Sequence, residues 1–408
     1  MVLCIKEYYN CFVIIIGQIS YGTIVGFPSP PGKGFNSDHH LEKSLLNTLT
    51  SAFAILGAFL TAGLIKVFHN SRKKTLFTIS CISVGFWAFN FLSTISILWS
   101  VLSGALMGIS LGCLSTIDPL YMIELHPEEK QDFYGILCQL GVPIGMIIFN
   151  FLGPTLTYME LYYVGASIDF FLAILALFID ESPAVAAIRL EEEKSIIENI
   201  PMESLFQKKY IISIIFGILL MFFQQFCGIT AIITYLVDIM TKTGIGLDQY
   251  YQAAITSSAQ IVSICCGAAI IEKIGLKITW IVSCAIVVIS LLIFALNEKF
   301  YWSNILPLVT IFFFQLGFGL GIGPIPWFVI PEYFTASLRS KASIITVSLN
   351  WLFAFVTIEI WPQLVKCYKM MGLFLFFSGI SLVALLFGIF CIKGKSNDDD
   401  RESTYWTI

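Results

Sequence analysis

The chain has 408 residues, of which 57% are hydrophobic and 12% are charged. Soluble domains carry roughly 25% charged residues, and the mean hydropathy here is +0.85, so the composition excludes a water-soluble globular protein. The formal net charge of −4, without a dense basic cluster, excludes nucleic acid as a partner. Most of the 11 cysteines lie inside apolar runs without metal-ligand or disulfide spacing, so neither a metal nor another cofactor is expected.

Long apolar runs divide the chain into candidate transmembrane helices, each of which needs about 20 residues. Segments without Asp, Glu, Lys or Arg cover 11–32, 44–65, 75–117, 133–159, 211–237, 249–271, 278–297, 300–331 and 342–358. The third of these is long enough for two helices and divides near Ser93–Ser96. Residues 161–179 and 370–392 add two spans, and the run around Trp351 extends to about Val365. The sequence therefore predicts an all-α integral membrane protein with twelve transmembrane helices.

The basic residues indicate how these helices are oriented. The first run lacks a small-residue cleavage site and is long enough to span, so we expect an uncleaved helix there and not a signal peptide. With the N-terminus inside, all Lys and Arg fall on the inner side except Lys33, Lys43, Lys242, Lys299, Lys366 and Lys369. The positive-inside rule therefore predicts that both termini are cytoplasmic.

The predicted helices form two halves of six. Pro119 and Glu124 near the end of the fourth span recur as Pro326 and Glu332 near the end of the tenth, on either side of a charged internal segment. Repeated six-helix halves with a substrate site between them are typical of secondary transporters. The expected units are an N-terminal half, a cytoplasmic linker, a C-terminal half and a cytoplasmic tail, at residues 1–181, 182–209, 210–392 and 393–408.

Polar and helix-breaking residues interrupt the seventh predicted span. Gln224 and Gln225 are adjacent carboxamides, and Gly228 allows the helix to loosen just beyond them. A carboxamide can donate and accept hydrogen bonds at once, which suits a hydroxyl-rich ligand. The alternative is a structural bond between helices, worth about 1 kcal/mol. The pair together with the glycine favours a binding site.

The tenth predicted span cannot be one straight helix. Alternate glycines run from Gly317 to Gly323 and are followed by Pro324 and Pro326, so the backbone must bend here. Trp327 directly follows the break, and its indole offers a flat apolar face and one N–H, which suits the C–H face of a sugar ring.

Further polar groups lie at membrane depth, each a weak signal alone: Gln139, Gln260 and the pair Asn350-Trp351. Together they fit a site of modest affinity. If about four to six hydrogen bonds each return roughly 1 kcal/mol, the dissociation constant falls roughly between millimolar and tens of micromolar. A carrier needs such weak binding in order to release its load.

At these residues the chain resembles the sugar-porter family of the major facilitator superfamily, over nearly its whole length. Residues 224–231 resemble the family motif Q-Q-x-x-G-I-N-A, and residues 323–327 match G-P-I-P-W. Residues 22–30 are similar to the first span of insect facilitated trehalose and hexose transporters. The resemblance implies a twelve-helix transporter of the major facilitator fold that carries a small sugar as a monomer in the lipid bilayer.

The resemblance also implies roles for individual residues. Sugar contacts carry over to Gln139, Gln224, Gln225, Trp327 and Asn350, with Thr230 and Gln260 standing where the family usually has Asn. The expected gating residues are Glu124, Glu272, Glu332 and Arg339 at the cytoplasmic gate, together with Gly228, Pro324 and Pro326 at the two broken helices.

Several positions depart from the family pattern. Residues 131–132 are Gln-Asp where the family has Arg-Gly, so Glu124 is expected to lack its usual partner. Residues 66–73 replace the family's G-R-[RK] turn, and Ala184 replaces the Arg of its P-E-S-P-R motif. Each lost pair would remove about 1 kcal/mol or more of bias between conformational states. Several together could shift the carrier inward-facing or abolish turnover.

The acidic residues bear on ion coupling. The family resemblance links proton symport to a carboxylate in the first span. That span here holds polar residues but no acid, so facilitated diffusion is favoured. Asp169 and Glu359 are the acids to explain, and we expect both to lie near span ends or packed against helices. We therefore predict a plasma-membrane sugar uniporter that works by alternating access, and not an enzyme, because no catalytic motif is present. The alternative, favoured by the altered gate, is a non-conducting sugar sensor of the same family.

Overall fold

The computed structural model describes residues 2–27, 40–94, 97–198, 203–241 and 243–393. Almost all of the predicted tail, and residues 28–30 of the first-span motif, lie outside the described residues. Within them the chain is helical without strands, and ten helices are long and apolar enough to cross a membrane. The all-α fold class is confirmed.

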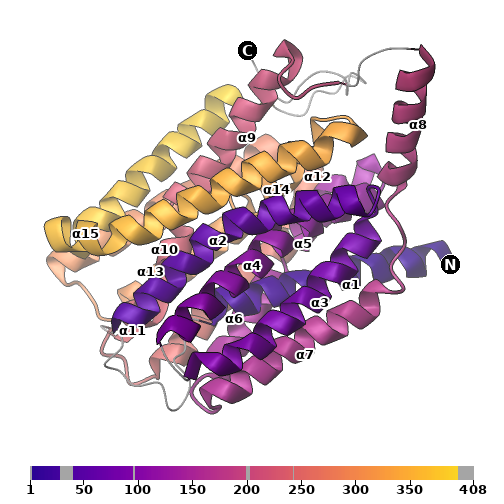
Figure 1. The fold of residues 1–408 in the computed structure, drawn as a ribbon. Coiled ribbons are helices and arrows are strands. Elements are labelled where there is room, and N and C mark those ends of the chain that lie inside the picture. Colours follow the sequence, from indigo (N-terminus) through magenta and orange to yellow (C-terminus); the bar gives the residue numbers. More distant parts are fainter. Residues whose placement is uncertain (1, 28–39, 95–96, 199–202, 242, 394–408) are drawn as a thin grey trace.

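The N-terminal half contains six of the predicted spans (Figure 1). They are α1 (Val2–Gly26), α2 (His40–Val67), α3 (Arg72–Phe89), α4 (Ile97–Leu125), α5 (Gln131–Cys138) continued by α6 (Gly141–Leu152), and α7 (Tyr158–Ala176). The 3-10 turn η1 (Asn90–Thr94) separates α3 from α4, which confirms the division predicted near Ser93–Ser96. A second 3-10 turn, η2 (Glu128–Lys130), precedes α5.

The linker and the C-terminal half follow. The linker holds α8 (Pro183–Glu198), and the half holds α9 (Lys208–Phe226), α10 (Ile229–Thr234), α11 (Leu236–Thr241), α12 (Gln249–Phe300), α13 (Leu306–Leu320), α14 (Ile325–Glu332) and α15 (Ala336–Cys391). Two of these contain a non-helical residue with positive φ, Gly275 in α12 (φ 78°) and Lys369 in α15 (φ 59°). Because each is therefore two helices joined at a kink, the described residues contain the twelve predicted spans.

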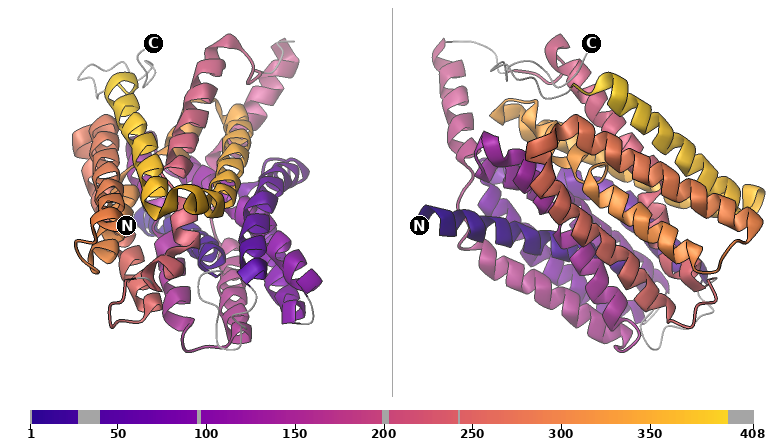
Figure 2. Two further views of the ribbon diagram at one scale, coloured as in Figure 1. Left: turned by 90° about the vertical axis from the view of Figure 1, so that its left-hand side faces the viewer. Right: turned by 180° about the vertical axis from the view of Figure 1, so that it is seen from behind.

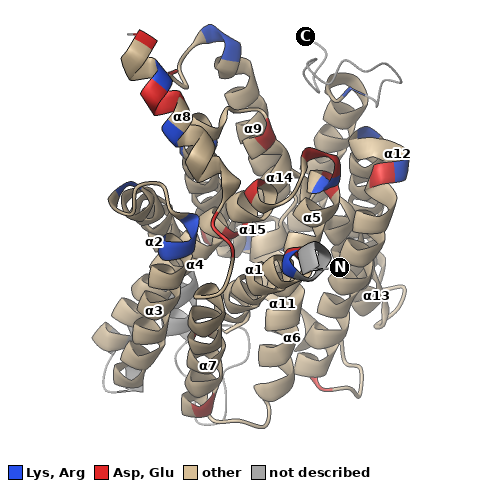
Figure 3. Ribbon diagram, turned by 90° about the vertical axis from the view of Figure 1, so that its right-hand side faces the viewer, with Lys and Arg blue, Asp and Glu red and all other residues tan. Residues whose placement is uncertain are grey.

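The two halves lie side by side, with the indigo-to-magenta helices of the N-terminal half against the orange-to-yellow helices of the C-terminal half (Figure 2). We call the end of the bundle that carries α8 the linker face. Figure 3 shows that most charged residues gather at or near this end, whereas the middles of the helices are almost entirely uncharged. This distribution fits a bilayer, since charge at the membrane centre is costly.

Glycines bring the backbones of α1 and α6 into contact. A β-carbon on Gly22 would lie 2.1 Å from the carbonyl oxygen of Val142, and one on Gly145 would lie 2.3 Å from the carbonyl oxygen of Ile19. Helices in membranes associate through such close packing, because apolar surface gains little by leaving lipid. The contact fixes the side chains of α1 relative to α5 and α6.

We expect Gly22→Ala to lower the melting temperature of the detergent-solubilised protein, because the added methyl group overpacks the α1–α6 contact at a cost of about 1–3 kcal/mol. Gly63→Ala is the matched control, since nothing lies within 4 Å of a β-carbon there. Thermal unfolding followed by size-exclusion chromatography measures both. Equal melting temperatures would show that the two helices can separate without loss of stability.

Candidate functional site

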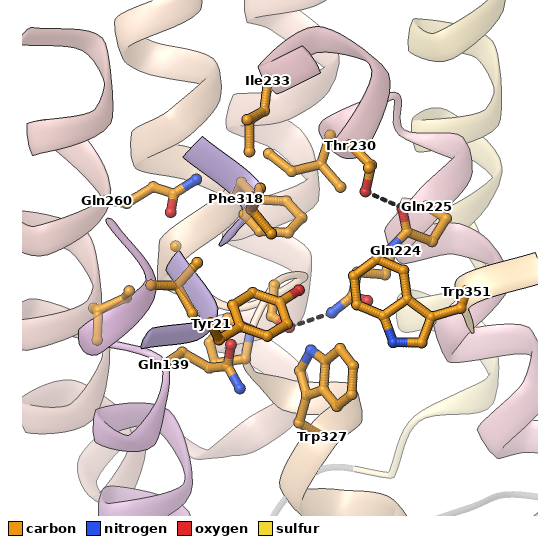
Figure 4. A pocket seen from close by; sticks show the side chains of 17 residues that line it. Tyr21, Gln139, Gln224, Gln225, Thr230, Ile233, Gln260, Phe318, Trp327 and Trp351 are labelled. Carbon is orange, nitrogen blue, oxygen red and sulfur yellow. Dashed lines mark hydrogen bonds between the residues drawn. The ribbon is translucent and has the colours of Figure 1, made fainter. Parts of the chain in front are cut away.

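A pocket lies between the two halves, and Figure 4 shows the side chains that line it. Six of the seven predicted sugar contacts form part of its wall: Gln139, Gln224, Gln225, Thr230, Gln260 and Trp327. The seventh, Asn350, is fully buried behind them. None of the 17 lining residues carries a charge.

The break in the seventh span presents the glutamine pair to this pocket. Helix α9 ends at Phe226, and Gly228 takes a left-handed conformation with φ 92° before α10 begins. A β-carbon on Gly228 would lie 2.5 Å from the ring of Phe377, so only glycine suits both this backbone conformation and this packing. Gln224 and Gln225 therefore lie in the last turn of a helix that ends at the pocket.

The polar side chains of the seventh and eleventh spans form one hydrogen-bonded chain. Thr230 Oγ1 donates to Gln225 Oε1 over 2.5 Å, and Gln225 Nε2 donates to Asn350 Oδ1 over 3.0 Å. Asn350 Nδ2 donates to Gln224 Oε1 over 2.6 Å, and Gln224 Nε2 donates to the carbonyl oxygen of Gly323. We call these five residues the carboxamide chain. Each glutamine keeps one N–H and further acceptor lone pairs for a ligand.

The tenth span breaks where the sequence predicts. Helix α13 ends at Leu320 and α14 begins at Ile325, and the first turn of α14 presents Trp327 to the pocket. The backbone stays bonded across the break, with the N–H of Gly323 on the carbonyl of Phe318 at 2.9 Å. Pro324 is the N-cap of α14 and Pro326 lies in its first turn, so neither removes a helical hydrogen bond.

Sequence reasoning missed several residues of the site. Tyr21 and Phe318 line the pocket, and Gln315 lies behind Gln260, whose Nε2 donates to Gln315 Oε1. Trp351, named in the sequence together with Asn350, lines the pocket as well. The signal for Gln315 was present, since it is an amide inside an apolar run. Phe318 and Tyr21 gave none, because an aromatic residue in a membrane helix is more often packing than binding.

Glu124 lacks the family's partner at residues 131–132, as expected, but it is not unpaired. Arg72 Nε and Nη2 each donate to one of its carboxylate oxygens over 2.9 Å, and both side chains are fully buried. Ser182 Oγ also donates to Glu124 Oε2 over 2.6 Å. The altered turn between α2 and α3 thus supplies the guanidinium that the turn after α4 lacks.

The remaining residues of the altered P-E-S-P-R motif complete this network at the linker face. Glu181 Oε1 accepts from the backbone N–H of Arg72 over 2.8 Å and of Lys73 over 3.3 Å, and Ser71 Oγ donates to Glu181 Oε2. A carboxylate at a helix N-terminus satisfies free N–H groups and complements the helix dipole. Ala184, where the family has arginine, contributes only its backbone N–H, which donates to Ser182 Oγ over 3.1 Å.

The corresponding end of the C-terminal half is different. Glu332 closes α14, yet no ion pair joins it to Arg339 in the described part of the chain, and Arg339 Nε donates to the carbonyl of Phe334 over 3.1 Å. Glu272 is exposed on α12 just before the Gly275 kink. Gating roles for these three residues remain predictions.

The buried acids lie away from the pocket wall. Asp169 is packed between helices as expected, fully buried, and accepts from Ser83 Oγ and, over 2.8 Å, from Trp87 Nε1. A further acid, Asp118, is fully buried in α4 and accepts from Gln18 Nε2 over 3.0 Å. Glu359 is exposed and accepts from Thr48 Oγ1.

We expect Arg72→Ala to destabilise the protein strongly, because it leaves the buried Glu124 carboxylate without its cation at a cost of about 3–5 kcal/mol. Replacing both partners, as Arg72→Met with Glu124→Leu, should recover much of this loss. Lys74→Ala is the control, since that side chain is exposed. The melting temperatures of the three variants are compared with that of the wild type. An Arg72→Ala variant as stable as the control would contradict a structural role for the pair.

Comparisons with known proteins agree with this geometry. A family model described as Sugar (and other) transporter matches residues 7–199 and 184–397. Facilitated trehalose transporter Tret1 of Bombyx mori is 24% identical, with 95% of this chain and 85% of the relative covered, and Sugar transporter ERD6 of Arabidopsis thaliana is 23% identical, with 96% and 86% covered. The solved structure of the proton:xylose symporter XylE bound to 6-bromo-6-deoxy-D-glucose has a TM-score of 0.77 at 18% identity, over 94% of this chain and 95% of that chain, which confirms the major facilitator fold. Because the family model extends over nearly the whole chain, this protein belongs to the sugar transporter family.

Proposed function

We propose that this protein carries a neutral sugar across a membrane by facilitated, alternating-access exchange. The observation that carries the proposal is an uncharged pocket between the two halves, lined by carboxamides and tryptophan. Carboxamides match the alternating donors and acceptors of a polyol, and indole faces match its C–H surface. A charged substrate would find no counter-ion among the lining residues. The family is one of transporters and not of enzymes, which agrees with this reading.

The two broken helices supply the points at which the C-terminal half bends. Gly228 interrupts the seventh span and Gly323-Pro324 interrupts the tenth, both beside the pocket. Toward the linker face the halves pack closely, since a β-carbon on Gly135 of α5 would lie 2.4 Å from the ring of Phe328 in α14. Opening toward that face therefore requires α14 to move away from α5.

Substrate, coupling and location complete the proposal. We infer uniport, because no acid lines the pocket and the buried acids Asp118 and Asp169 each bond to neutral side chains within the N-terminal half. Tret1 is named a trehalose transporter, and a hexose or trehalose is the substrate class that we propose. The excess of basic residues on the linker face supports cytoplasmic termini, and we propose that the protein works as a monomer in the plasma membrane.

Counterflow tests transport directly. Purified protein in liposomes loaded with unlabelled glucose or trehalose, without a proton gradient, should accumulate the labelled sugar transiently. Accumulation in only one of the two loads would identify the substrate. Binding without counterflow would instead identify a non-conducting sensor, an outcome that the intact Arg72–Glu124 pair argues against.

We expect Gln224→Ala to reduce counterflow roughly 10-fold or more, because it removes two or more hydrogen bonds of about 1 kcal/mol each from the site. Gln363→Ala, at an exposed glutamine of α15, is the matched control. Reconstituted protein is quantified in each liposome preparation so that rates refer to equal amounts. Unchanged counterflow in Gln224→Ala would exclude the pocket as the sugar site.

A further inference from the structure

Tyr21 places a hydroxyl without a partner in the pocket. It lines the wall from α1, and no described residue exchanges a hydrogen bond with its Oη. By contrast, Tyr9 donates to the carbonyl of Leu175 over 2.9 Å, and Tyr121 donates to the carbonyl of Asp180. Tyr21 Oη is not one of the fully buried unpartnered atoms, so it opens into the pocket, and whatever fills the pocket, water or ligand, supplies its partner.

The ring of Tyr21 is held in one place. It belongs to the turn of α1 whose Gly22 touches the backbone of α6, so the helix cannot rotate to withdraw the side chain. On the other side its ring lies 6.0 Å from that of Trp351 at an angle of 48°. Figure 4 shows the hydroxyl directed toward the side of the pocket where Gln224 and Trp351 lie.

The halves contribute unequally to the pocket. The carboxamide chain belongs to the C-terminal half, and its members already bond to one another. The polar side chains that the N-terminal half adds to the wall are Tyr21 and Gln139, and neither has a side-chain hydrogen-bond partner in the described part of the chain. A ligand held by both halves therefore needs one or both of these groups.

We propose that Tyr21 is a substrate-binding residue whose hydroxyl exchanges a hydrogen bond with one ring hydroxyl of the sugar, and that it helps to select which sugar is carried. The proposal rests on the proposed function, because it assigns a further contact within the same site. It goes beyond the sequence motifs, none of which includes this tyrosine. The aromatic body of the side chain packs against Trp351, so the hydroxyl alone carries the selectivity.

Tyr21→Phe removes the hydroxyl and keeps the ring. The test measures counterflow of the transported sugar in competition with each of its single-deoxy analogues, in the wild type and in this variant. In the wild type, the analogue that lacks the partner hydroxyl should bind about 3- to 10-fold more weakly than the parent sugar. In Tyr21→Phe the parent should weaken by a similar factor, and that one analogue should lose nothing further.

The outcomes separate the two proposals. If the wild type shows neither counterflow nor binding, the proposed function falls and Tyr21 falls with it. If the wild type transports but Tyr21→Phe keeps the wild-type preference between the parent sugar and its analogues, only the Tyr21 contact is overturned. The same holds if the parent and all analogues bind Tyr21→Phe more weakly by an equal factor. Tyr163→Phe, on a tyrosine 58% exposed on α7, is the control. Because affinities are compared within one variant, a smaller folded fraction does not imitate the expected result, and Tyr21→Met provides a second hydroxyl-free variant.

Discussion

Hydrocarbon offers no hydrogen-bond partners, so every polar group at membrane depth must be satisfied by the protein or by what the protein binds. The carboxamide chain shows how this constraint shapes the site. Its four side chains and one carbonyl join the broken seventh span, the broken tenth span and the eleventh span. At the two helix breaks, backbone N–H and C=O groups lose helical partners, which costs free energy at membrane depth. The bonds of the carboxamide chain are among those that offset this cost. The binding site and the stability of the C-terminal half thus depend on the same residues.

The N-terminal half meets the same constraint with charge. Arg72, Glu124 and Ser182 form a fully buried cluster at the linker face, and Glu181 closes the start of α3. No comparable ion pair between Glu332 and Arg339 is found in the described residues. The N-terminal half is therefore tied at its end by a buried ion pair, whereas the ion pair at the start of the C-terminal half, Lys209–Glu203, is exposed. This asymmetry fits a stiff half against which a more pliable half moves.

The sequence was sufficient to predict the twelve spans, because apolar length and helix breakers act locally, and it was sufficient to group the glutamines, Trp327 and Asn350 at one site. It failed where a contact depends on chain segments far apart. Arg72 and Glu124 are 52 residues apart, and a motif compared position by position reports a lost partner although another segment supplies one. Tyr21 was missed for a related reason, since only the packing of α1 on α6 decides that its hydroxyl faces the pocket.

The bond from Gln224 to the carbonyl of Gly323 gives the two broken helices a mechanical connection. The Gln224 side chain, near the break in the seventh span, is bonded to the backbone at the break in the tenth. The two spans are therefore expected to move together. A ligand that competes for the Gln224 amide loosens this connection at the point where the tenth span turns. The amide that bonds the two breaks also lines the pocket, so an occupant that took over this hydrogen bond would free the joint between them.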